Sequence, residues 1–234
     1  SRTTMSQKKN IIAPLVKFQE LLVVTLVVLV SLFYLEPEEL IIKADGKGYY
    51  EYLPATFIYN DLTWSYLDTL DTPGYYNHKD YVVGAIIGPQ GDLHNKYYVG
   101  TALLMSPFFL SAHAFAKMSK YTPDGYTKPY QRAMWLSALF YLWLGIYLMR
   151  KLLLGMKIKN RVVFLLQLLV VFATPLLHYV TFEAAFSHVY SFATFAALIY
   201  TFYLFKQTQK NRYLYLFAIL CASVFLIRPL NILM

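Results

Sequence analysis

One short segment of this 234-residue sequence combines residue types that can do chemistry. Residues 44–53 read Ala-Asp-Gly-Lys-Gly-Tyr-Tyr-Glu-Tyr-Leu. The glycines at 46 and 48 permit a tight turn directly after Asp45, and a carboxylate held there can accept a proton from a hydroxyl nucleophile. An ordinary aspartate in a surface turn is the competing interpretation, and the spacing alone does not separate the two.

A second polar group, His178, Glu183 and His188, lies between two long apolar runs. An acid at membrane depth is costly unless it is paired or hydrated. We therefore expect Glu183 at the tip of a helical hairpin, where water can reach it.

The helices that must position these groups are predicted by uncharged, apolar runs. The chain is 58% hydrophobic and 15% charged, with a mean hydropathy of +0.42. Helices of about 20 apolar residues are typical of membrane spans. The sequence therefore predicts an all-α, polytopic transmembrane helix bundle with about five spans. The runs are Leu21–Leu35, Ala133–Met149, Val162–Phe182, Ala184–Phe205 and Tyr213–Ile227.

The charges predict how this bundle is oriented. Eleven of the 13 acids lie between Glu36 and Asp124, whereas residues 150–161 and 206–212 contain only basic charges. Because Lys- and Arg-rich short loops stay on the cytoplasmic side, the +8 net charge indicates topology rather than nucleic-acid binding. We expect an inside tail (1–13), a first span (14–35), an outer, periplasmic loop (36–132) and four further spans (133–234). The charges thus predict a multi-pass integral membrane protein.

The uncharged run Tyr97–Ala116 has two interpretations. As a span it would put the basic cluster 150–161 on the outer face, against the charge rule. We therefore favour juxtamembrane helices at the outer interface, with breaks at Gly100 and Pro107. The outer loop also holds 13 of the 22 tyrosines, which suit either an aromatic belt at the membrane surface or a surface that stacks on sugars.

Several motifs together resemble the GT-C superfamily of polytopic glycosyltransferases. The resemblance is closest to the bacterial branch near protein O-mannosyltransferases and lipid A aminoarabinose transferases, and it makes this chain similar to the N-terminal part of a longer enzyme. The motifs are Asp45–Leu53, Asn95–Gly100 with Ser106–Phe109, Asp124–Tyr126 with Pro129–Tyr130, Ser187–Phe192 and Arg228–Asn231.

The resemblance implies that a sugar moves, with inversion, from a polyprenyl-phosphate donor to an acceptor whose identity the sequence does not give. It makes Asp45 the general base. The leaving lipid phosphate needs cations, and Lys96, Arg132 and Arg228 are the candidates. Glu183 and His188 are candidate ligands for donor hydroxyls or phosphate, and Tyr49 and Tyr50 for the substrate. The non-catalytic alternatives are that Lys96 and Arg132 are ordinary loop cations, that Glu183 is a solvated acid at the hairpin tip, and that Arg228 is an interface anchor.

Two further alternatives stay open. His78, Asp80, Asp92 and His94 lie in one loop and have the residue types that bind divalent ions, but their spacing matches no strong metal signature, so we expect no cofactor. A transporter or a non-catalytic subunit of a membrane assembly is the competing function. Transporters place polar groups near the bilayer midplane, whereas here the polar residues gather outside the predicted spans.

Overall fold

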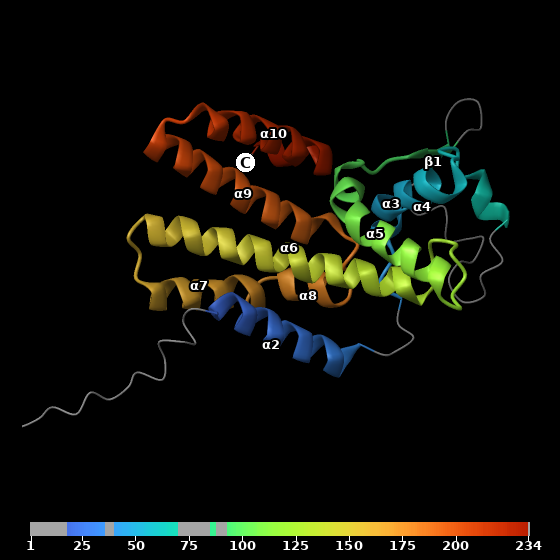
Figure 1. Ribbon diagram of the computed structural model, residues 1–234, viewed down its shortest axis with the longest axis horizontal. Helices are drawn as coiled ribbons and strands as arrows, with labels where there is room; N and C mark the ends of the chain where they lie inside the picture. Colours follow the sequence, from blue (N-terminus) through green and yellow to red (C-terminus); the bar gives the residue numbers. More distant parts are fainter. Residues whose placement is uncertain (1–17, 36–39, 70–84, 88–92, 234) are drawn as a thin grey trace, which may run out of the picture.

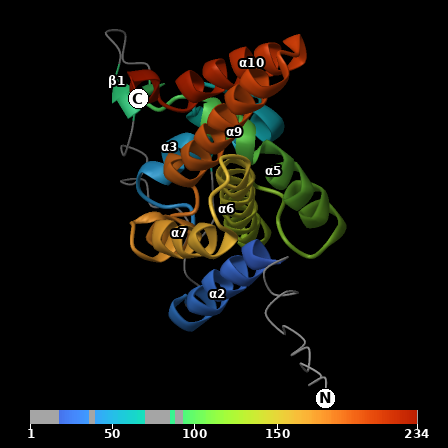
Figure 2. The same ribbon diagram turned by 90° about the vertical axis from the view of Figure 1, so that its left-hand side faces the viewer.

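The computed structural model describes residues 18–35, 40–69, 85–87 and 93–233. Long helices form a bundle (Figures 1 and 2), and the described part of the predicted outer loop gathers at one end of it (Figure 1). The elements of the bundle are α2 (Gln19–Tyr34), α6 (Lys128–Gly155), α7 (Asn160–Phe172), α8 (Leu176–Thr181), α9 (Ser187–Thr208) and α10 (Asn211–Ile227).

The described outer elements are short apart from one helix. A two-stranded antiparallel sheet pairs Ala85 with Asn95 and Ile86 with His94. The elements are α3 (Asp45–Tyr50), α4 (Tyr52–Pro54), η1 (Ala55–Tyr59), η2 (Ser65–Thr69), β1 (Ala85–Ile87), β2 (Leu93–Asn95), α5 (Gly100–Met118) and, after α10, η4 (Pro229–Leu233).

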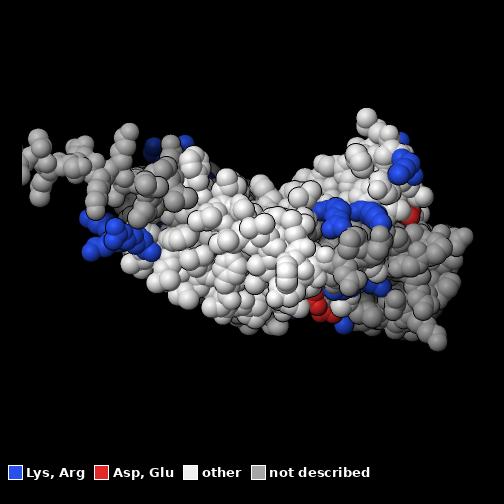
Figure 3. Space-filling model, turned by 90° about the horizontal axis from the view of Figure 1, so that it is seen from below, with Lys and Arg blue, Asp and Glu red and all other residues white. Residues whose placement is uncertain are grey.

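The helical prediction is confirmed, and two helices, α6 and α9, are long and apolar enough to cross a membrane. The helices α2, α7 and α10 are apolar but shorter. The turns after α6 and α9, which carry the basic clusters, lie at the same end of the bundle (Figure 1). Figure 3 shows a broad uncharged surface between the charges at the two ends. A count of five spans stays a prediction.

Two details of the prediction are wrong. The run Val162–Phe182 is not one helix, because Pro175 starts a new helix and Thr174 bonds both to Val170 O and to Leu176 N. The predicted break at Pro107 does not occur, because α5 runs through it. The Leu103 carbonyl, which proline cannot bond, accepts a hydrogen bond from Ser106 Oγ at 2.7 Å.

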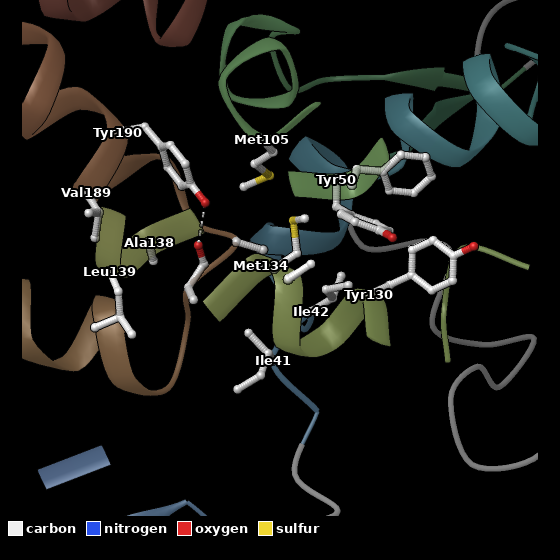
Figure 4. Packing of buried hydrophobic residues seen from close by; sticks show 14 of the residues in the cluster. Ile41, Ile42, Tyr50, Met105, Tyr130, Met134, Ala138, Leu139, Val189 and Tyr190 are labelled. Atoms are coloured by element: carbon white, nitrogen blue, oxygen red, sulfur yellow. Dashed lines mark hydrogen bonds between the residues drawn. The ribbon is translucent and has the colours of Figure 1, made fainter. Parts of the chain in front are cut away.

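Several tyrosines in the described part of the outer region belong to a buried core. Figure 4 shows Tyr50 and Tyr130 packed with Met105 and Met134 between the outer helices and α6. All four of these side chains are fully buried, and Tyr126 is buried with them. Tyrosine packing therefore fixes the outer segment onto the bundle.

A buried polar network joins α2 to α6 and α7. Arg150 Nη1 lies 3.3 Å from Glu20 Oε2, and the two carboxylate oxygens of Glu20 both accept from it. Gln19 donates to Gln167 at 2.6 Å, and Asn160 donates to Gln19 at 2.8 Å. Because buried charges are tolerated when paired and hydrogen-bonded, this network holds the first helix against the bundle.

Candidate active site

Asp45 is the first residue of α3, and the backbone before it is constrained. Ala44 has φ 45° and ψ −133°, a conformation that costs a non-glycine residue energy and needs support from its surroundings. The segment packs closely at the next glycine, Gly46, because a Cβ there would lie 2.9 Å from the Ala185 side chain. The glycine thus lets α3 approach the turn between α8 and α9.

Tyr97 covers the other side of α3. A Cβ on Gly48 would lie 1.9 Å from Tyr97 Cδ2, so only glycine leaves room for the ring. Asn95 holds this arrangement, since it donates to Gly48 O at 2.6 Å and accepts from Tyr97 N at 2.9 Å. Tyr52 Oη adds a 2.7 Å bond to Tyr97 O. The Tyr97 ring also lies 4.6 Å from that of Tyr49.

The Tyr97 hydroxyl lies near the Asp45 carboxylate, which is its hydrogen-bonding neighbour in the site. Its oxygen is buried and makes no hydrogen bond of standard geometry with any described residue. Burial raises the pKa of Tyr97, the nearby Asp45 carboxylate raises it further, and Arg228 opposes the shift. The phenol is therefore neutral at physiological pH and can donate a hydrogen bond to a ligand.

A cavity of about 610 Å³ opens beside these residues. Two cations border it, and Lys96 Nζ lies 5.1 Å from the centre of the Tyr97 ring. Arg228 follows α10, and the η4 segment after it is tied to α9 by a 3.1 Å bond from Asn231 to Ser191. The lining residues are Tyr49, Lys96, Tyr97, Tyr98, Arg228, Pro229, Leu230 and Asn231.

His188 brings α9 into the same neighbourhood. Its ring stacks on Tyr179 with centroids 3.9 Å apart, and the charges of Arg228 and Asp45 both act on it. The structure thus gathers Asp45, Tyr97, His188 and Arg228, which are far apart in sequence. Such a group can orient a hydroxyl, accept its proton and hold an anion.

Three further predicted site residues are not among those that line this cavity. Tyr50 is fully buried and donates its hydroxyl to Gly125 O, so it serves the core. Glu183 lies in the turn between α8 and α9, as predicted, where its Oε2 is 3.5 Å from His178 Nε2. Arg132 borders a different cavity, between α5 and α6.

Within the described residues, no group of three or more His, Cys, Asp or Glu could hold a metal ion. Of the four residues considered for a metal, His94 is described and is exposed, and the other three lie outside the described residues. Sequence reasoning missed Tyr97 and Asn95, although both belong to a segment from which Lys96 had been selected. The signal available in the sequence was that Tyr97 directly follows the candidate cation Lys96.

Comparisons of the chain with protein-family models, with curated proteins and with solved structures gave no match.

Proposed function

We propose that this chain is a GT-C-type membrane glycosyltransferase, which moves a sugar from a polyprenyl-phosphate donor to an acceptor hydroxyl at the outer face of a bacterial inner membrane. The observation that carries the proposal is the single neighbourhood formed by Asp45, Tyr97 and Arg228 beside a cavity with cations at its edge. This neighbourhood belongs to the end of the bundle opposite the basic turns.

The chemistry follows from the charges. Asp45 takes the proton of the acceptor hydroxyl as its oxygen attacks the anomeric carbon from the side opposite the phosphate. The bond from the anomeric carbon to the phosphate oxygen breaks, and polyprenyl phosphate leaves with the bonding electrons. Lys96 and Arg228 stabilise that negative charge. The donor's own phosphate ester drives the transfer, so the proposal includes no nucleotide or metal cofactor.

The remaining residues of the site position the sugar. The neutral Tyr97 phenol donates to a sugar or phosphate oxygen, which would satisfy its buried hydroxyl. Tyr49 offers a second ring at the cavity wall, and aromatic faces pack on the apolar faces of sugars. His188, already stacked on Tyr179, orients hydroxyls as a hydrogen-bonding group.

The membrane placement rests on the apolar helices and on where the charge lies. An N-terminus inside and basic turns inside put the Asp45 site outside. The uncharged surface in Figure 3 is the lipid-facing band. Exposed apolar side chains also occur along α2, α7 and α10, for example Leu29, Leu165 and Ile219. Multi-pass insertion is part of the proposal.

The decisive experiment measures polyprenyl phosphate, a product that is the same for any sugar. The full chain is reconstituted in liposomes with glycolipids extracted from bacterial membranes, and polyprenyl phosphate release is followed by mass spectrometry. Asp45→Asn should lower release at least about 100-fold, since general base catalysis contributes about 10²–10⁴. Asp61→Asn, the same substitution in a surface turn with Thr63 and Ser65, should not. Equal release by both variants would refute the assignment of Asp45.

A transporter is the second candidate, and one observation favours it. The Glu20–Arg150 pair with Gln19 and Gln167 is largely buried among apolar helices, and polar groups enclosed by a helix bundle often mark substrate paths. Movement of a labelled glycolipid across the liposome membrane, without release of polyprenyl phosphate, would support transport instead.

A further inference from the structure

A second cavity, of about 450 Å³, lies between α5 and the first turns of α6. It shares no lining residue with the cavity that Tyr97 and Arg228 line. Its volume falls in the range typical of small-molecule sites, about 300–1,000 Å³. Its walls are apolar on both helices, with Phe108, Ala112 and Phe115 from α5 and Ala133 and Leu136 from α6.

Polarity in this cavity changes in one direction along α6. Lys128, Arg132 and Leu136 all line it, and residues four apart share one face of a helix. The stripe therefore begins with a cation at the first residue of α6, continues with a second cation one turn on, and reaches Leu136 about 12 Å from the start. Leu136 is 52% exposed, so this apolar end opens outward.

The nearby charges reinforce the basic end. Lys117 and Lys120, at the end of α5 and just after it, are both exposed. Asp124, the acid of the connecting loop, is buried and accepts hydrogen bonds from the backbone nitrogens of Tyr126 and Thr127. The end of the cavity near the start of α6 is therefore lined by the two cations Lys128 and Arg132, and most of the remaining lining residues are apolar.

We propose that this cavity binds an anionic phospholipid. The phosphate of the headgroup lies between Lys128 and Arg132, and one acyl chain follows the stripe past Leu136 between α5 and α6. Charge complementarity favours this occupant over a zwitterionic or neutral lipid, because its headgroup brings a net negative charge to the end of the cavity that Lys128 and Arg132 line. The bound lipid fastens α5 to α6, one of the two helices long enough to cross a membrane.

The test uses the purified full chain in detergent, with phosphatidylglycerol and phosphatidylcholine added separately. Native mass spectrometry should show one phosphatidylglycerol bound in preference to phosphatidylcholine. The double variant Lys128→Gln/Arg132→Gln should bind it about 30-fold more weakly, because each cation near an anionic surface contributes about a fivefold change in affinity. The matched control Lys206→Gln/Lys210→Gln, which removes two exposed cations from the opposite end, should bind like the wild type.

A second variant keeps Lys128 and Arg132 and fills the apolar part of the cavity. Ser111 is exposed and lines the cavity, so Ser111→Trp should block the acyl chain without disturbing the core. Loss of phosphatidylglycerol binding in this variant supports the proposal. Equal binding of the two lipids by the wild type, unchanged binding by either variant, or full competition by soluble glycerol phosphate would overturn it.

Discussion

Asn95 donates a 2.6 Å hydrogen bond to the carbonyl oxygen of Gly48, which fastens the strand before α5 to the helix that begins with Asp45. The same asparagine accepts from Tyr97 N. One side chain therefore sets the distance between the candidate base and the tyrosine that faces it. The catalytic proposal depends on this local bracing as much as on Asp45.

The bracing predicts the effect of Gly48→Ala. The added methyl would overlap the Tyr97 ring, and overpacking costs about 1–3 kcal/mol. We expect a lower unfolding temperature and at least a tenfold loss of polyprenyl phosphate release, since the ring must move. Asn95→Ala should lower release in the same way. Wild-type release by Gly48→Ala would show that the position of Tyr97 is unimportant.

Tyr97→Phe should separate stability from function. The buried Tyr97 hydroxyl makes no hydrogen bond of standard geometry and has Asp45 as its polar neighbour, so its removal should change the unfolding temperature little while donor binding weakens. Tyr52→Phe is the matched control, because it removes a 2.7 Å bond to Tyr97 O and should cost about 1 kcal/mol. Thermal unfolding in detergent measures the stability of each variant, and donor titration measures its donor binding. A strongly destabilised Tyr97→Phe would mean that the hydroxyl already has a partner.

Glu20 and Arg150 should stabilise the fold strongly only when both are present. The Glu20 side chain is 6% exposed and that of Arg150 19%, and removing one partner of a buried pair costs about 3–5 kcal/mol. The partial exposure of Arg150 puts our expectation at the lower end. Glu20→Leu and Arg150→Leu should each lower the unfolding temperature, and the double variant should lose less than their sum. Additive losses in this double-mutant cycle would contradict coupling.

Alkaline pH should unfold the outer region first. Burial, followed by the charges of neighbouring groups, raises the pKa of Tyr50 and of Tyr66 above the ordinary value of 10.0. Because the unfolded chain loses these protons near pH 10 and the folded chain keeps them, their contribution is complete below pH 10 and is lost as the pH rises further. The slope of stability above pH 10 should decrease in Tyr66→Phe but not in the exposed control Tyr98→Phe.

Thiol labelling tests the orientation. In a Cys221→Ser background, a membrane-impermeant reagent on intact cells should label Asn60→Cys, because the outer region faces outward. It should label Lys157→Cys only after the cells are opened, because basic turns stay inside. Both positions are exposed in the structure. Labelling of position 157 from outside would mean that α5 crosses the bilayer.

Much of the bundle could be predicted because apolar composition acts locally. The runs Leu21–Leu35, Ala133–Met149, Ala184–Phe205 and Tyr213–Ile227 overlap α2, α6, α9 and α10, with ends that differ by up to six residues. The breaks were harder to predict, because they depend on which polar group replaces a missing backbone bond. Pro175 ends the run begun by α7, whereas Pro107 is accommodated in α5 by Ser106.

The sequence by itself determined the apolar helices, the separation of charge and the candidacy of Asp45, because these depend on residue type and near neighbours. Only the tertiary structure decided which candidates meet. Gly46 against Ala185 and Gly100 against the Leu226 backbone are close approaches between segments more than 100 residues apart. They bring Asp45, Tyr97, His188 and Arg228 together and leave Tyr50 in the core, because long-range packing, unlike helix formation, depends on the shape of both surfaces at once.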